Sequence, residues 1–248
     1  MSYHDWTIGQ DNSDIETNPA RCLPPSNIGG SCSLSGSLDQ IDWSRFTRLV
    51  TLYLADTGIS GSIPNSLATL PSLQIINLSD NSLRGAIPSF TGVRFLALSA
   101  NNNQLSGDFA SILFSLPSDT MQLLSLGGNS ITGFIPDQIE SYTTLFYIDI
   151  SNNGIGGTVP DTIGQLTGLQ GLILESNQFQ GTIPDALASS MPRLTQLRLH
   201  DNFFQDDLTA PFCSFAIGAG TTADCGTPQL VVCPCCLCYS KDRGGFFL

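Results

Sequence analysis

Few residues in this sequence have the types and spacing that catalysis needs. The histidines are His4 and His200, and Asp201 follows His200 directly. A His–Asp pair can supply a base and its orienting carboxylate, but no nucleophile motif or metal-binding partner accompanies this pair. Asp149 and Glu175 could act as paired carboxylates, yet no phosphate-binding loop, HExxH or kinase motif is present. We therefore interpret these polar residues as exposed and solvated, and predict no catalytic residue, no cofactor and no enzyme activity.

Cysteine is the other residue type with reactive chemistry, and its positions are confined to the two ends of the chain. An even number of cysteines in the end segments indicates disulfides, and hence an oxidising compartment. The CxCCxC run at 233–238 is also compatible with zinc or copper(I), or with free thiols. We favour disulfides, with Cys22 paired to Cys32 and the pairing of the rest unresolved, and predict no metal. The cysteines are Cys22, Cys32, Cys213, Cys225, Cys233, Cys235, Cys236 and Cys238.

Charge and composition exclude several classes of partner. The 248 residues include 9 Lys and Arg against 21 Asp and Glu, a formal net charge of −12. Such an acidic chain repels phosphate backbones and anionic membrane surfaces, so we expect no nucleic-acid partner. No apolar stretch is long enough to span a membrane. Only 12% of residues are charged, and a surface rich in uncharged polar residues favours an extracellular, cell-surface or cell-wall location, although no leader peptide is visible at the start.

The central part of the chain repeats a short pattern, LxLxxNxLxG. The alternation of aliphatic and polar residues predicts a short strand with one buried face. Such strands, stacked about 4.8 Å apart in a parallel sheet, build a continuous core that no single unit could bury. Gly and Pro in every unit exclude long helices. The second aliphatic residue recurs at steps of 24 or 48, with a last step of 25, at Leu54, Leu78, Leu126, Ile150, Leu174 and Leu199.

One unit departs from this spacing. We interpret Leu96 and Leu98 as its strand pair, followed by Leu105 and Gly107. The step from Leu98 to Leu105 is seven residues, where the other units have five. We therefore predict that the asparagine run 101–103 forms a small bulge or loop beside the strand.

A second motif, Gly-x-Ile-Pro or Gly-x-Val-Pro, follows the first at 61–64, 85–88, 133–136, 157–160 and 181–184. With it the chain resembles the plant-type leucine-rich repeat family, LxxLxxLxLxxNxLxGxIPxxLGxL, over roughly residues 34–208. The resemblance implies an α/β solenoid: a right-handed superhelix with a parallel concave β-sheet and short 3-10 or helical turns on the convex side. We expect an N-terminal cap with a partial repeat (1–45), about seven 24-residue repeats (46–208, irregular near 90–117) and a Cys-rich C-terminal cap (209–248).

The asparagine of the repeat is expected to be structural. Placed after the strand, it turns inward at a corner, where its amide can donate to and accept from backbone groups of adjacent units. This pairing satisfies main-chain groups that would otherwise be buried without a partner. The predicted ladder consists of Asn81, Asn129, Asn153, Asn177 and Asn202, and Thr57 occupies the same position in the first full unit.

The concave face is the predicted binding surface. Residues between the inward aliphatic residues point outward, and equivalent ones line up across the strands. One such line is predicted to contain large apolar residues in succession, and apolar patches of this kind mark partner sites. Mutual packing, or cover by a terminal segment folded back, is the alternative. The predicted partner-binding residues are Tyr53, Ile75, Phe95, Leu123, Phe146 and Tyr147.

The sequence contains one N-glycosylation motif, Asn77-Leu78-Ser79. It lies on the same predicted strand face, where a glycan on Asn77 would shade Ile75 and move binding toward Tyr147.

These observations favour a non-enzymatic extracellular recognition module that binds a protein or peptide on its concave face, the class that the plant-type resemblance also implies. The alternative is a structural protein of an extracellular matrix or filament, self-associated through its caps and Cys-rich tail. An ice-binding surface is a third idea, which the mixed residues at the x position of Gly-x-Ile do not favour.

Overall fold

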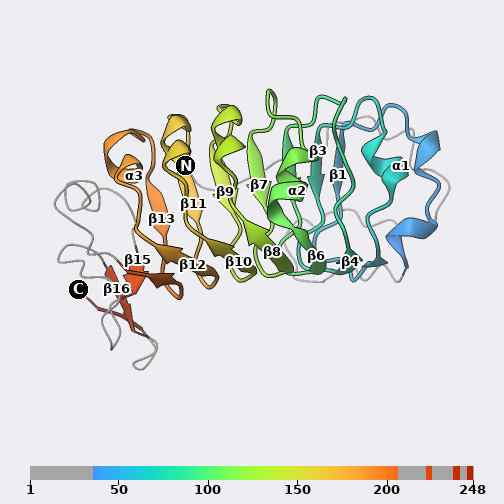
Figure 1. Ribbon diagram of the computed structural model, residues 1–248. Coiled ribbons are helices and arrows are strands. Elements are labelled where there is room, and N and C mark those ends of the chain that lie inside the picture. Colours follow the sequence, from blue (N-terminus) through green and yellow to red (C-terminus); the bar gives the residue numbers. More distant parts are fainter. Residues whose placement is uncertain (1–35, 206–221, 225–236, 241–244, 248) are drawn as a thin grey trace, which may run out of the picture.

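The protein is a solenoid of stacked coils in a computed structural model that describes residues 36–205, 222–224, 237–240 and 245–247. Each coil contributes a strand to one sheet, a strand to a second sheet and, in most coils, a short helix that closes the turn (Figure 1). The predicted α/β solenoid is confirmed.

The first sheet forms the concave side and contains ten strands. The strands follow one another across the sheet in the order in which they occur along the chain. Adjacent strands are parallel, except that the last strand pairs antiparallel with the strand before it. Each of the repeat strands is three residues long, and its central residue, such as Leu52 or Leu98, is buried in the core. They are β1 (Thr51–Tyr53), β3 (Ile75–Asn77), β5 (Ala97–Ser99), β7 (Leu123–Ser125), β9 (Tyr147–Asp149), β11 (Gly171–Ile173), β13 (Gln196–Arg198), β15 (Thr222–Asp224), β16 (Leu237–Ser240) and β17 (Gly245–Phe247).

The second sheet contains seven strands and runs along the lower edge of the molecule in Figure 1. Each strand is shifted by two residues relative to the next strand. For example, Gly154 is one residue after Asn153, whereas its partner Thr132 is three residues after Asn129, the equivalent asparagine. The strands are β2 (Ser60–Gly61), β4 (Ser82–Gly85), β6 (Gln104–Asp108), β8 (Ser130–Phe134), β10 (Gly154–Gly157), β12 (Gln178–Gly181) and β14 (Phe203–Phe204).

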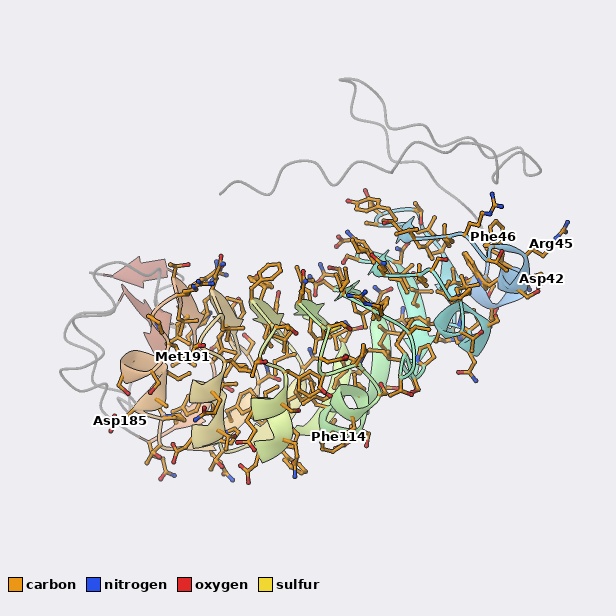
Figure 2. The ribbon with its side chains drawn as sticks, turned by 90° about the horizontal axis from the view of Figure 1, so that it is seen from above. Asp42, Arg45, Phe46, Phe114, Asp185 and Met191 are labelled. Carbon is orange, nitrogen blue, oxygen red and sulfur yellow. The ribbon has the colours of Figure 1, made fainter. Side chains whose placement is uncertain are left out.

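Short helices cover the opposite side from the concave sheet, as the view from above shows (Figure 2). The proline of the Gly-x-Ile-Pro motif is extended and stands directly before the helix in several units, as Pro136 and Pro160 do. Asp108 takes this place before α2, and its carboxylate accepts from the Ser111 N–H. The helices are η1 (Leu38–Gln40), η2 (Trp43–Arg45), α1 (Asn65–Ala68), α2 (Phe109–Phe114), η3 (Asp137–Ser141), η4 (Asp161–Gln165) and α3 (Ala186–Ser189).

The core is a continuous stack of aliphatic residues between these three sides. The two aliphatic positions of the repeat are buried in unit after unit, including Ile76, Leu78, Leu124 and Leu126. At the front, Trp43 is buried and its indole N–H donates to the Leu38 carbonyl. No unit buries this surface alone, so the stability of each coil depends on its neighbours.

The asparagine ladder has the predicted hydrogen bonds. In the unit of Asn153, the side-chain amide donates to the carbonyls of Leu126 and Ile150 at 3.0 and 3.2 Å, and the side-chain oxygen accepts from the Ile131 N–H at 2.9 Å. The other predicted members make equivalent bonds, and Asn103, which was not predicted, makes them too.

The predicted bulge at 101–103 is wrong, because the irregular unit is in register. Leu98 pairs with Ile76 on one side and Leu124 on the other, so Leu98 and Ala100 are its buried strand pair instead of Leu96 and Leu98. The spacing from Ile76 to Leu98 is two residues shorter than the usual 24, and the spacing from Leu98 to Leu124 is two residues longer. Longer and shorter turns on the helical side absorb this difference, which leaves the sheet undisturbed.

The predictions for the chain ends fall largely outside the described residues. The structure describes no cysteine side chain, and of Cys238 it describes only the backbone in β16. Of the predicted N-terminal cap it describes residues 36–45, where Ser37 forms a bridge to Ser60 and Leu38 is buried against the core. The disulfides and the cap boundaries therefore stay predictions.

Candidate functional site: the concave face

The concave face is formed by the residues on either side of the buried central residue of each strand. Because the strands are in register, these residues line up across the sheet in two rows. The first row, before the centre, is Thr51, Ile75, Ala97, Leu123, Tyr147, Gly171 and Gln196. The second row, after the centre, is Tyr53, Asn77, Ser99, Ser125, Asp149, Ile173 and Arg198.

Phe95 is not on this face, and its prediction as a partner-binding residue is wrong. Its side chain is fully buried, and its ring stacks on Phe90 with the centroids 4.2 Å apart. The strand lies two residues later than the Leu96–Leu98 pair predicted, so Ala97 takes the place in the first row. A signal for the correct register was present in the sequence: Asn103 precedes Leu105 by two residues, as Asn81 precedes Leu83.

Four of the other predicted partner-binding residues lie on strands of the concave sheet. Ile75, Leu123 and Tyr147 are half-buried members of the first row, and Tyr53, in the second row, is 54% exposed. Phe146 directly precedes its strand and is half-buried. Leu96, which the sequence analysis placed in the core, takes the position equivalent to Phe146 and is also half-buried. We call Ile75, Leu96, Leu123, Phe146 and Tyr147 the concave apolar patch.

A glycine beside Tyr147 sets the shape of the patch. A Cβ atom on Gly171 would lie 2.4 Å from Cδ2 of the Tyr147 ring. The ring therefore lies over the backbone of β11, in the space that any larger residue at 171 would fill. This packing makes Tyr147 a broad, flat part of the surface and ends the patch on the side of the later repeats.

A strip of polar groups runs beside the patch, where the strands end. The Asn101 amide donates to Ser125 Oγ at 2.8 Å, and Asn101 Oδ1 accepts from the Gly127 N–H at 2.7 Å. In a neighbouring unit Ser151 Oγ donates to Asp149 Oδ1 at 2.7 Å. Because these groups hydrogen-bond to one another, they fix the polar edge of the concave face beside the apolar patch.

Charged groups gather at the end of the sheet formed by the later repeats. Glu175 Oε1 lies 3.4 Å from Arg198 Nη1, and Glu175 Oε2 lies 3.3 Å from His200 Nε2. His200 is 8% exposed, so the interpretation of His200–Asp201 as an exposed pair is wrong for the histidine. Glu175 is held by these two side chains and is not simply solvated. Within the described ranges, no group of three or more His, Cys, Asp or Glu side chains could hold a metal ion.

The glycosylation motif lies on the concave sheet as predicted from its strand position. Asn77 is a half-buried member of the second row, and its Oδ1 accepts from the Ser79 N–H at 3.1 Å. Ser79, the hydroxyl residue of the motif, is 8% exposed. Occupancy of this motif stays a prediction.

Comparison with known proteins agrees with the repeat geometry. The family model described as Leucine Rich Repeat matches residues 48–70, 72–92, 120–142 and 144–166. The receptor-like kinase TMK2 of Arabidopsis thaliana is 35% identical over 129 residues, which are 48% of this chain and 14% of that protein. Receptor-like protein 41 of the same plant is 35% identical over 107 residues, 42% of this chain and 12% of that protein.

Solved structures of plant receptors have the same fold. The ectodomain of the receptor kinase GASSHO1/SCHENGEN3 from Arabidopsis thaliana, solved with CASPARIAN STRIP INTEGRITY FACTOR 2, superposes with a TM-score of 0.67 at 27% identity. It covers 76% of this chain, and the chain covers 22% of it. The plant peptide hormone receptor RGFR1, solved with RGF2, gives a TM-score of 0.68 at 27% identity, with 76% and 31% covered. The chain therefore spans a minor part of each of these relatives. No helix that the structure describes has the length and apolar character needed to cross a membrane.

Proposed function

Because the chain is a plant-type leucine-rich repeat protein, we propose that it is an extracellular, non-enzymatic binding module whose concave apolar patch engages a peptide or a protein segment. The observation that carries this proposal is the patch itself. Its five side chains are half-buried and come from neighbouring coils, three from strands of the concave sheet and two from the residues directly before a strand.

The energetics of the patch suit partner binding. In most of the repeat the apolar residues are buried in the core, so apolar side chains left on the open side are not needed to hold the coils together. Contact with a partner would remove this apolar surface from water, at about 25 cal/mol for each Å² buried. Tyr147 adds an aromatic ring of fixed orientation, and such rings are frequent anchors of binding energy at interfaces.

The relatives support a peptide or protein as the partner and the cell surface as the location. RGFR1 is a peptide hormone receptor solved with RGF2, and GASSHO1/SCHENGEN3 is a membrane receptor kinase. The match to TMK2 falls in the leucine-rich repeat region, so it supports binding and not kinase activity for this chain. An extended peptide laid across several strands would contact successive members of the patch, because they are one strand spacing, about 4.8 Å, apart.

The proposal is tested by selecting ligands from a phage-displayed library of linear peptides on the immobilised full chain. We expect enrichment of peptides with apolar or aromatic residues. Leu123→Asp should weaken the selected peptides tenfold or more, because binding would bury its charge in an apolar contact without a partner.

Phe114→Asp provides the matched control, since Phe114 is 52% exposed and lies on α2, on the helical side (Figure 2). It introduces the same charge and should leave peptide affinity unchanged. Circular dichroism and thermal unfolding verify that both variants remain folded. The proposal is refuted if no peptide is enriched over the bare support, if the selected peptides bind Leu123→Asp as tightly as the parent, or if both variants lose affinity equally.

A further inference from the structure

The outward face of the second sheet is uncharged over its later strands. The strands β8, β10, β12 and β14 contain no Asp, Glu, Lys or Arg. Their exposed side chains are Ser130, Thr132, Phe134, Gln178, Gln180 and Phe203, and we call this surface the side face. The helical side, by contrast, exposes Asp137, Glu140, Asp161 and Asp185. In a chain with a net charge of −12, these four strands contain no charged residue, and Asp108 on β6, in register with Thr132, marks the border of the side face.

Two aromatic rings stand on the side face. Phe134 is 52% exposed on β8 and Phe203 is 60% exposed on β14. The order of the sheet is β14-β12-β10-β8, so the two residues are three strand spacings apart. Phe203 is in register with Gln180, two residues beyond the Gln178 that lines up with Phe134, so the two residues are about 16 Å apart. The rings are therefore separate platforms and do not form the contiguous apolar cluster that anchors a protein interface.

Between the two rings, part of the surface is formed by backbone alone, with hydrogen-bonding side chains on either side. Phe134 is in register with Gly156, and Gly156 with Gln178, so no side chain stands between Phe134 and Gln178. A Cβ atom on Gly156 would lie 3.2 Å from the Gln178 carbonyl oxygen. The glycines of β10 thus keep this part of the sheet flat and low.

We propose that the side face binds an extended, uncharged, β-linked polysaccharide. The C–H faces of sugar rings stack on aromatic side chains, and sugar hydroxyls hydrogen-bond to groups that both donate and accept, as the amides of Gln178 and Gln180 do. The Thr132 hydroxyl donates to the Gly107 carbonyl and can accept from a sugar hydroxyl. A neutral polymer needs no charged partner, which matches the composition of the side face. Each sugar in an extended chain advances by about one strand spacing, so a few successive sugars bridge the two rings.

This site is independent of the concave apolar patch. The side face lies on the second sheet, and the patch lies on the first. One molecule could therefore hold a neutral cell-wall polymer on the side face while its concave face remains open to another partner. Failure of either proposal leaves the other standing.

The test is affinity electrophoresis of the full chain in gels containing hydroxyethyl cellulose, a neutral β-1,4-glucan, with polygalacturonate gels as the anionic comparison. We expect the chain to be retarded by the neutral polymer only. The double variant Phe134→Ala/Phe203→Ala should raise the apparent dissociation constant tenfold or more, with an unchanged melting temperature because both rings are more than half exposed.

Phe114→Ala is the matched control, because Phe114 has the same 52% exposure as Phe134 on a different side of the molecule. It should bind the neutral polymer as the parent does, and so should Leu123→Asp, which damages only the concave patch. The inference is overturned if the parent chain is not retarded, if polygalacturonate retards it equally, or if the double variant binds as tightly as Phe114→Ala.

Discussion

The asparagine ladder allows a quantitative prediction at Asn177. Its side-chain amide donates to the carbonyls of Ile150, Leu174 and Glu175 at 2.8, 3.2 and 3.3 Å, and its Oδ1 accepts from the Ile155 N–H at 3.0 Å. Asn177 is 7% exposed, so water cannot readily replace these bonds. In Asn177→Ala the Ile155 N–H loses this acceptor, whereas the Ile150 and Leu174 carbonyls each keep a second donor, from Asn153 and Asn202.

The loss of stability in Asn177→Ala can be worked out from these hydrogen bonds. A buried group left without its partner costs about 1–3 kcal/mol, and each weakened acceptor costs less, so we expect Asn177→Ala to lower the free energy of unfolding by about 3 kcal/mol. At roughly 2–4 °C for each kcal/mol in a chain of this size, the melting temperature should fall by about 6–12 °C. Calorimetry and urea unfolding measure both quantities.

The control removes an amide of similar size from the surface. Gln180 is exposed on β12, in the same coil, and Gln180→Ala should change the free energy of unfolding by less than about 0.5 kcal/mol. If Asn177→Ala cost no more than this control, the ladder would not stabilise the stack as argued.

Two further perturbations test the packing and the titration of buried aromatic residues. Phe95→Ala should lower the free energy of unfolding, measured in urea, by about 3–5 kcal/mol because it leaves a cavity at a fully buried site beside Phe90. A loss as small as that of Tyr53→Ala, at an exposed position, would contradict the burial of Phe95. Burial raises the pKa of Tyr142 above its ordinary value of 10.0, so the folded state retains a proton that the unfolded state loses, and stability should be constant below that pH and fall above it. Tyr142→Phe should reduce this alkaline loss in unfolding measured between about pH 8 and 11; an unchanged slope would contradict the role of Tyr142.

The recurring spacing explains why so much of the fold could be predicted. Aliphatic, asparagine, glycine and proline residues at fixed offsets each carry a local physical requirement, and their recurrence makes those requirements agree from coil to coil. The parallel concave sheet, the helical side and the hydrogen bonds of residues such as Asn153 all follow from this agreement. The second sheet and its two-residue stagger do not, because the short segments before Gly-x-Ile-Pro carry too little pattern to reveal how they pair.

The candidate site was predicted less well, and the irregular unit shows why. Leu96 and Leu98 fit the aliphatic pattern of the strand as well as Leu98 and Ala100 do. The position of Asn103 favours the second pair, and the pairing of Leu98 with Ile76 and Leu124 establishes it. A shift of two residues keeps the same alternation of sides, so the pattern of apolar residues is insensitive to it. It nevertheless moves Phe95 from the predicted surface into the core and leaves Leu96, predicted to be buried, only half-buried.

The sequence by itself determined the period, the residue types that face inward and the ladder that joins the coils, since these depend on requirements repeated within each unit. The tertiary structure decided which apolar residues of the irregular unit are exposed, how His200 is buried beside Glu175, and how Phe134 and Phe203 come to share one uncharged face. These outcomes depend on register between coils and on the stagger of the second sheet, and both are set by contacts between residues more than 20 positions apart.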